Sequence, residues 1–487
     1  MDTESGRCWR CGKKLRQATQ LGCEQCGGLP AYCSRSCQQQ DKARHKAVEC
    51  KMYGPKACAL CGKEGKIKEC AMCNQAWYCN KECQIQHWPA HKQACKTHKE
   101  QAISVVSYCR SCNTAKKRCS KDFPYYIGNT PAVDFLQLDN NEWHDGRGKT
   151  ETEKEKERDY RVLSAGCGNL RNTIMTAASL PEGYQGCLHV TLNDKDRFVM
   201  ARNVLFLHML AQLQDGNDIG SKVATIWSSL RLPAEHYGLV TASLDRLLAV
   251  GDAAGLSEAT RGLVTLIAGD LEPLHRVWSC WRAMECRQGQ RGYINLQQQR
   301  REYFKAKPNI KEYHANYLAI QSKAERPHMQ KWLDHALFLP TLTPEIASLP
   351  YDNPTLTGQA ELGGYGLEYS VNDDAMPFTE WDSHRVRRET AGTPSPSPMV
   401  MFHAYLTTKL LKVRQLILQG RLRVAIALTD FQLLPKCHDA AALPRYDRIF
   451  TSNLADYFGV STLLHTLKPL LNANNPSSVL VTEFMNW

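Results

Sequence analysis

The chain has 487 residues, enough for two or three folded units that include one sizeable core. No run of about eighteen apolar residues occurs, which excludes a membrane-spanning helix. The opening Met1-Asp-Thr-Glu-Ser5 lacks a charged-then-apolar signal pattern. We therefore expect the 22 cysteines to be thiols or metal-bound thiolates in the cytosol or the nucleus.

The first 95 residues contain two copies of one cysteine and histidine pattern. Two close Cys pairs complete the tetrahedral shell of one zinc ion, so eight ligands per copy predict two sites per copy and four ions in all. The ligands of the first copy are Cys8, Cys11, Cys23, Cys26, Cys33, Cys37, His45 and Cys50. Those of the second copy are Cys58, Cys61, Cys70, Cys73, Cys79, Cys83, His91 and Cys95. A closed four-ligand site leaves no position for water, which favours a structural role over a catalytic one.

Residues 8–50 and 58–95 resemble the MYND-type zinc finger, a small cross-braced interaction module. The resemblance implies that the pairs interleave in each finger. In the second finger one ion would be held by Cys58, Cys61, Cys79 and Cys83, and the other by Cys70, Cys73, His91 and Cys95. In the first the sets would be Cys8, Cys11, Cys33 and Cys37, and Cys23, Cys26, His45 and Cys50. The first copy departs from the pattern by a wide Cys11–Cys23 gap and by four residues between His45 and Cys50.

The same resemblance implies protein partners, recognised through proline-containing peptides along a shallow apolar groove. The matching residues are Gln84 and Trp88, and a Trp on a metal-clamped helix offers a large, preorganised contact surface. The alternative is that Trp88 only packs over the zinc sites. The first finger has Gln38 but Lys42 in place of the aromatic residue, so we expect it to brace the second.

The formal net charge of +12 changes once the cysteines bind zinc. Seven thiolates outweigh two Zn²⁺ ions in each finger, which leaves a net charge of about +6. The basic residues of the fingers are scattered and are not interleaved with stacking aromatic residues, so nucleic acid is not an expected partner.

A connector is predicted at residues 101–160, after a first finger at 1–54 and a second at 55–100. It contains Cys109, Cys112 and Cys119, which lack a fourth cysteine partner. We interpret them either as a metal site or as reduced thiols. The run at 144–161 is highly charged and has too few apolar residues for a packed core.

Strand and helix patterns alternate in residues 161–487, which predicts an α/β domain with a mostly parallel sheet. A helical insertion is expected at about 220–337, and a Pro- and Ser-rich linker near 393–398. The last predicted strand runs almost directly into Trp487, from which we expect either an incomplete sheet or a short form of the chain. The predicted strands are 162–165, 188–192, 423–428, 445–450 and 479–482.

Three segments, 163–172, 192–194 and 451–456, resemble an uncharacterised domain family. This domain also occupies the N-terminal half of the dynein axonemal assembly factor three group. Residues 127–132 belong to the likeness, which therefore begins near residue 123. It implies a Rossmann-like, methyltransferase-related fold, and no activity carries over with it.

Gly166 and Gly168 follow a strand and precede a helix, where a backbone can closely approach a bound ligand. Asp194, at the end of the next strand, could accept hydrogen bonds from ribose hydroxyls, as in sites for S-adenosylmethionine. The alternative is a purely structural turn, because the third small residue is missing and Asp194 follows Gly168 by 26 residues rather than about 20. Arg171 either takes over the role of the missing glycine or pairs with Asp194.

No catalytic residue is predicted. The 451–453 segment at a strand end is where related folds position a reacting amine, but we expect Asn453 and Asp456 to cap the following helix. The leading hypothesis is a zinc-dependent scaffold or adaptor, which is not an enzyme. The alternative is an S-adenosylmethionine-dependent protein methyltransferase, and a third reading is a cytosolic dynein preassembly factor, on fold-level analogy.

Overall fold

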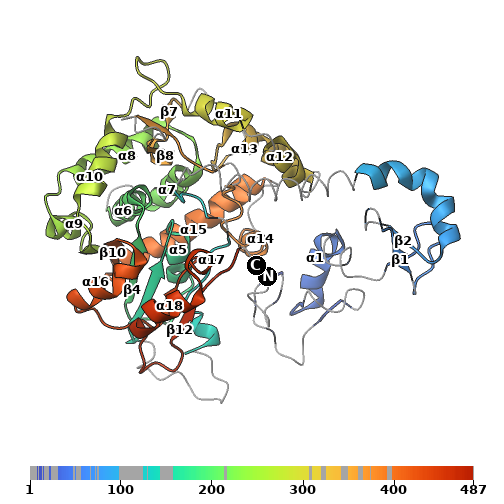
Figure 1. Cartoon of the computed structure of the whole chain (residues 1–487), viewed down its shortest axis with the longest axis horizontal. Coiled ribbons are helices and arrows are strands. Elements are labelled where there is room, and N and C mark those ends of the chain that lie inside the picture. The colour runs from blue at the N-terminus through green and yellow to red at the C-terminus, as the bar shows by residue number, and fades with distance from the viewer. Residues whose placement is uncertain are drawn as a thin grey trace. The chain divides into compact units, whose positions relative to one another are not determined.

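The structure is a computed structural model of the whole chain (Figure 1). It describes parts of residues 8–97, then 124–142 except residue 129, 157–212, 216–306, 310–319, 325–341, 349–359, 366–372, 375–391 and 397–485. The chain divides into two compact units. One comprises Met1–Ser120, Pro308–Ser322 and His384–Pro394, and the other comprises Lys121–Lys307, Lys323–Ser383 and Ser395–Trp487.

The two fingers are built alike. The second contains an antiparallel pair, β1 (Lys68–Glu69) and β2 (Trp77–Tyr78), and a helix at residues 81–97. The first has an isolated antiparallel bridge between Leu21 and Tyr32, followed by α1 (Arg35–Ala47). So little secondary structure cannot enclose a core of ordinary size, and half of the buried residues described in the second finger are cysteines. The first unit also includes α12 (Ile310–Ala319) and most of α14 (Ser383–Glu389).

The second unit is built on a six-stranded sheet with the order β12-β11-β3-β4-β10-β6, in which every pairing is parallel. The predicted α/β fold class, with a mostly parallel Rossmann-like sheet, is confirmed. The strands are β3 (Tyr160–Ala165), β4 (Leu188–Asp194), β6 (Val264–Ala268), β10 (Leu422–Leu428), β11 (Arg448–Phe450) and β12 (Val479–Val481). Successive residues of the central strands β3 and β4 are buried, which shows that both faces of these strands are covered.

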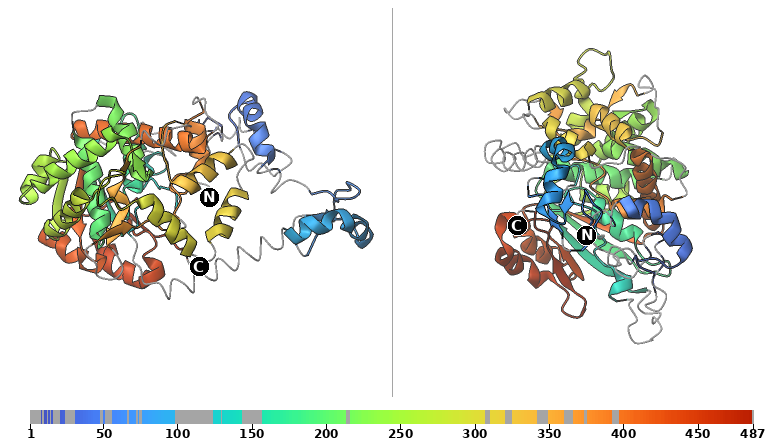
Figure 2. Two further views of the ribbon diagram at one scale, coloured as in Figure 1. Left: turned by 90° about the horizontal axis from the view of Figure 1, so that it is seen from above. Right: turned by 90° about the vertical axis from the view of Figure 1, so that its right-hand side faces the viewer.

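Helices cover both faces of this sheet (Figures 1 and 2). One face is covered by α5 (Arg171–Ala178), α6 (Arg197–Ala211), α7 (Ile219–Ser228) and α15 (Pro398–Leu418). The other is covered by α16 (Leu434–Ala440), α17 (Ala455–Phe458) and α18 (Val460–Leu467), whose buried residues pack with Leu163 and Ile449 of the strands. From β3 the chain adds β4 on one side of the sheet and later adds β11 on the other side. The crevice where such folds bind ligands therefore lies at the carboxyl ends of β3 and β11.

The helical insertion lies between β4 and β10, but the stretch predicted as helical also contains β6. Val264-Thr-Leu-Ile-Ala268 is too short and too rich in β-branched residues for a helix, and it pairs with β10 at the sheet edge. The helices of this region are α8 (Ala234–Leu248), α9 (Ala253–Ala259), α10 (Glu272–Ala283), α11 (Leu296–Ala306) and α13 (Arg326–His335). Two short antiparallel pairs accompany them, β5 (Arg231–Leu232) with β7 (Tyr351–Asp352) and β8 (Thr357–Gln359) with β9 (Leu367–Tyr369).

Short 3₁₀ helices complete the described elements. They are η3 (Leu138–Asn140), η4 (Gly216–Asp218), η6 (Pro354–Leu356), η7 (Phe431–Leu433) and η8 (Lys468–Leu470). Within the described part of the chain, no helix combines the length and the apolar character needed to cross a membrane.

Candidate functional sites

The second finger brings its eight predicted ligands together in two groups. Cys58, Cys61, Cys79 and Cys83 form one group and Cys70, Cys73, His91 and Cys95 the other, which is the interleaved arrangement that the resemblance implied. The Sγ atom of Cys61 lies 3.6 Å from that of Cys79 and 3.9 Å from that of Cys83. Tetrahedral zinc with Zn–S bonds of about 2.3 Å places sulfurs about 3.8 Å apart, so the spacing fits the ion.

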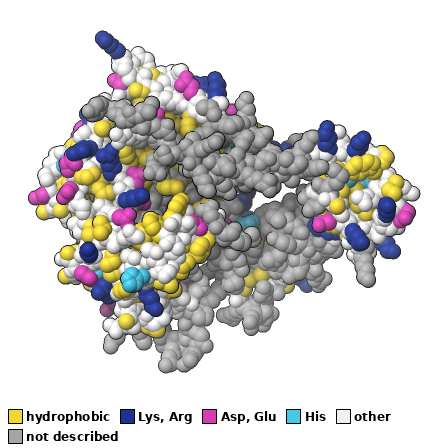
Figure 3. Space-filling view, viewed as in Figure 1, with side chains coloured by type: hydrophobic (Ala, Val, Ile, Leu, Met, Phe, Trp, Pro, Cys, Tyr) yellow, Lys and Arg dark blue, Asp and Glu magenta, His cyan; other side chains and the backbone are white. Residues whose placement is uncertain are grey.

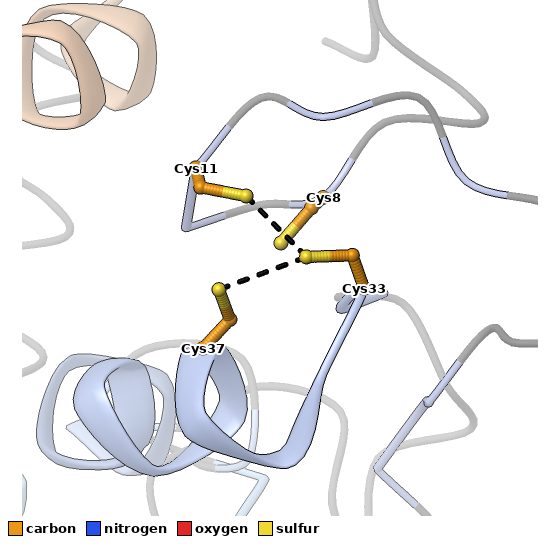
Figure 4. A group of neighbouring side chains, drawn as sticks. All are labelled: Cys8, Cys11, Cys33 and Cys37. Carbon is orange, nitrogen blue, oxygen red and sulfur yellow. Dashed lines mark hydrogen bonds between the residues drawn. The ribbon is translucent and has the colours of Figure 1, made fainter.

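The first finger repeats this geometry. Cys8, Cys11, Cys33 and Cys37 converge as shown in Figure 4, with Sγ–Sγ distances of 3.4 Å from Cys11 to Cys33 and 3.7 Å from Cys33 to Cys37. Cys23, His45 and Cys50 form the other group, and their predicted fourth partner, Cys26, lies outside the described residues. The connector cysteines Cys109, Cys112 and Cys119 also lie outside them.

The electrostatics of the sulfur groups favour a bound cation. The backbone N–H of Cys61 lowers the pKa of Cys58 to about 6. The side chain of Cys79 raises the pKa of Cys83 to about 12, since neighbouring thiols share protons and do not all ionise. A divalent ion removes this conflict because it binds the thiolate form of every ligand. The cysteine clusters therefore form zinc-binding sites.

Side chains next to the ligands hold the second finger in shape. The Asn80 side-chain oxygen accepts a hydrogen bond from the Cys83 N–H at 2.8 Å and caps the helix that carries Cys83 and His91. The Tyr78 hydroxyl and His87 Nδ1 are 3.0 Å apart.

Equivalent side chains occupy the same positions in the first finger. Ser34 Oγ accepts a hydrogen bond from the Cys37 N–H at 3.2 Å, and the Tyr32 hydroxyl donates to Asp41 at 2.8 Å. Sequence reasoning missed these residues in both fingers. Alignment of the two copies could have found them, because the sequence Tyr-Cys-Ser/Asn recurs at the third Cys pair.

Trp88 is half-buried on the helix of the second finger and packs against the cluster formed by Cys58, Tyr78 and Cys95. Its ring centroid lies 6.1 Å from that of His91. Gln84 is half-buried one turn earlier, and Ile85, beside it, is 61% exposed. The helix therefore presents an apolar surface around Trp88 that rests on the metal site. Figure 3 shows basic and hydrophobic side chains interspersed on the visible face of this finger rather than one continuous basic patch.

The glycine turn at the crevice adopts a conformation that favours glycine. Gly166 and Gly168 have φ of 62° and 55°. Both backbone groups of Gly168 are already used: its N–H donates to Asp194 Oδ2 at 3.0 Å, and its carbonyl accepts from Asn203 Nδ2 at 2.7 Å. The other carboxylate oxygen of Asp194 accepts from the Asp196 N–H at 3.0 Å. Burial raises the pKa of Asp194.

The chain itself fills the space in front of this turn. A Cβ atom on Gly166 would lie 3.1 Å from the Leu454 side chain, and one on Gly168 would lie 3.7 Å from the Tyr125 carbonyl oxygen. Tyr125 belongs to a segment that we call the 124–132 segment, described except for residue 129. Tyr126 in this segment is 1% exposed, and its hydroxyl donates to the Thr357 carbonyl at 2.7 Å.

Buried Glu380 anchors the 124–132 segment. Its Oε1 accepts from the Gly128 N–H at 2.7 Å and from the Asn169 amide, and its Oε2 accepts from Trp227 Nε1 at 3.1 Å. Glu380 has no exposed surface, and burial raises its pKa. Residues distant in sequence thus hold the 124–132 segment beside the glycine turn.

Arg171 also binds this segment, and the suggested pairing with Asp194 is not what the structure shows. Its guanidinium donates to the Thr130 carbonyl at 3.0 Å, the Thr130 hydroxyl at 2.9 Å and the Asn169 side chain at 3.3 Å. Arg171 thus holds the segment across the turn instead of facing an open site.

The predicted capping at residues 453–456 is wrong. Helix α17 has Leu454 at its N-cap without any side-chain cap. Asp456 instead accepts from the Met485 N–H at 2.8 Å and lies 3.5 Å from the Asn453 amide. The reason is tertiary: the chain after β12 returns to this loop and offers donors that compete with the helix terminus.

Residues 58–95 match the MYND finger family, and residues 126–231 match a domain of unknown function, DUF4470. The chain therefore carries a zinc-binding module of a protein-interaction class, next to a Rossmann-like domain to which the match assigns no function. No solved structure matches the chain.

Proposed function

We propose that this protein is a zinc-dependent scaffold or adaptor whose second finger recruits partners through proline-containing peptides. The observation that carries the proposal is the position of Trp88, a half-exposed indole on a helix fixed by His91 and Cys95. A rigid aromatic surface contacts a prolyl ring at little cost in conformational entropy. Gln84 and Ile85 would complete the groove.

The first finger supports a bracing role in this proposal. Lys42 occupies the position of Trp88 and is exposed, and the Gln38 amide donates to the Gly22 carbonyl of its own finger at 3.2 Å. Both matching positions thus lack the features of a peptide groove. The α/β unit would supply a second docking surface, in the cytosol or the nucleus.

Capture of proline-containing peptides by the full-length, zinc-loaded chain tests the proposal. Trp88→Ala should weaken capture, whereas Lys92→Ala, at an exposed position of the same helix, should not. Zinc content measured in parallel separates loss of the groove from loss of the finger. Equal capture by wild type and Trp88→Ala, with zinc retained, would refute recruitment through this groove.

The methyltransferase alternative rests on Gly166, Gly168 and Asp194, and the hydrogen bond between Gly168 and Asp194 weighs against it. Calorimetry with S-adenosylmethionine at millimolar concentration tests it directly, and absence of heat removes it. The dynein-preassembly reading rests on the family resemblance alone. It predicts association with chaperones or dynein chains in ciliated cells, and absence of both would end it.

A further inference from the structure

A polar pocket of about 320 Å³ lies at the amino-terminal end of the sheet, away from the crevice at the carboxyl ends. Its walls come from the chain around the start of β3, the chain before β11 and the turn between η8 and β12. The volume is at the small end of the range for ligand sites. The lining residues are Arg158, Asp159, Arg161, Pro444, Arg445, Asp447, Asn472 and Asn474.

The buried carboxylate of this pocket is compensated from within the fold. Asp447 is 2% exposed and accepts from the Arg158 guanidinium at 3.0 Å and from the Arg161 N–H at 2.9 Å. The amides of Asn472 and Asn475 donate to it at 3.2 and 2.8 Å. With four donors already in place, Asp447 needs no further cation.

Arg161 also lines the pocket, and its guanidinium is not one of the donors to Asp447. Among the residues that the structure describes, none forms a hydrogen bond or an ion pair with this half-buried group. The strand register places Arg161 beside His189, and His189 beside Arg423. Asp159, the other carboxylate of the pocket, accepts from the Cys187 N–H at 2.8 Å and lies 3.3 Å from His189 Nε2.

We propose that this pocket binds the phosphate group of a phosphate monoester, with Arg161 as its principal donor. A guanidinium presents paired N–H groups that match two phosphate oxygens, and desolvation strengthens such charge-assisted bonds. Arg158, which pairs with Asp447, Arg445, which lies 3.4 Å from Asp439, and Asn474 also line the pocket. The volume leaves room for a small group attached to the phosphate. This site is independent of the peptide groove on the second finger.

Titration calorimetry on the full-length, zinc-loaded chain tests the site with two probes, O-phosphoserine and adenosine monophosphate. At least one should bind saturably, and Arg161→Gln should raise its Kd by about tenfold or more, with partial recovery in Arg161→Lys. Arg276→Gln is the matched control, because Arg276 is exposed and pairs with Glu272 one helical turn away. It should bind as wild type does.

The two probes identify the source of the phosphate: preference for phosphoserine indicates a phosphoprotein, and preference for the nucleotide indicates a small molecule. The proposal is overturned if neither probe saturates at millimolar concentration, or if Arg161→Gln and Arg276→Gln bind alike. Should Arg161→Gln fail to fold, phosphate-dependent shifts of arginine side-chain NMR signals in the wild type decide the question. No such shifts would then mean no site.

Discussion

The backbone N–H of Gly168 donates to the carboxylate of Asp194 at 3.0 Å, so the turn and the acid that could have held a nucleotide bind one another. A phosphate-binding turn works by presenting unpaired N–H groups to its ligand. Here the group is satisfied internally, and the 124–132 segment lies over the turn. The Rossmann-like sheet thus uses its ligand-binding position to fasten its own chain.

Replacement of Asp194 distinguishes a structural role in the glycine turn from a role in cofactor binding. Asp194→Asn should lower the free energy of unfolding by about 1–3 kcal/mol, because a charged acceptor of two backbone N–H groups is lost. Urea unfolding followed by tryptophan fluorescence measures the change, which should be the same with and without S-adenosylmethionine. A cofactor site would give a different result. S-adenosylmethionine would then stabilise the wild type but not Asp194→Asn, and the two proteins would be equally stable without it.

Removal of the Glu380 carboxylate should lower the free energy of unfolding more than Asp194→Asn does. Glu380→Ala leaves the Gly128 N–H and the Trp227 indole without their acceptor and removes one of the carboxylates near Arg171, at a cost of about 3–5 kcal/mol. Glu272→Ala, which breaks an exposed pair with Arg276, should cost about 0–1 kcal/mol. Urea unfolding compares the two variants, and similar losses would contradict the anchoring role of Glu380.

Acid should destabilise the α/β unit through His403. Burial, with a contribution from His236, lowers the pKa of His403 from 6.5 to about 3. Because the folded pKa is depressed, unfolding takes up a proton below pH 6.5, and stability falls with decreasing pH in the window between these values. In this window His403 contributes a slope of about 1.4 kcal/mol per pH unit to the free energy of unfolding.

Urea titrations at several pH values should show this slope in wild type and a shallower dependence in His403→Gln. His465→Gln, at an exposed position on α18, is the comparison variant. The same pH dependence in both variants would show that His403 does not contribute.

Chelation should unfold the fingers and leave the parallel sheet intact. Binding of a structural zinc ion contributes about 10–16 kcal/mol in model peptides, and the second finger has few buried residues besides its cysteines. EDTA should abolish the NMR dispersion of residues 8–97, while hydrogen exchange in β3 and β4 stays slow. Unchanged finger spectra after verified metal removal would contradict this.

Zinc stoichiometry should follow the individual ligands. Cys79→Ser should lose about one zinc ion per chain, because its cluster then has only three sulfur ligands. Cys280→Ser, an exposed cysteine on α10 outside the clusters, should lose none. Elemental analysis counts the ions, and full zinc occupancy in Cys79→Ser would rule out this ligand set.

Several features followed from local sequence. Cys58 and Cys61 are close because two intervening residues permit little else, so the zinc chemistry could be predicted without a fold. The alternation of strand and helix patterns in residues 161–487 predicted a mostly parallel sheet, and β3, β4 and β10 are parallel neighbours in it. Strand β6 was missed because periodicity alone does not distinguish a short apolar run from a segment of a buried helix, although its β-branched residues favour a strand.

The packing of the 124–132 segment at the glycine turn was decided only by tertiary structure. Glu380 meets Asn169 at a sequence separation of 211 residues, and Arg171 meets Thr130 at a separation of 41. Glycine spacing showed where a ligand could approach, but no local pattern encodes which distant segment occupies that place. Close packing of buried polar groups, each requiring a partner, selects that segment, and this selection exists only once the whole chain has folded.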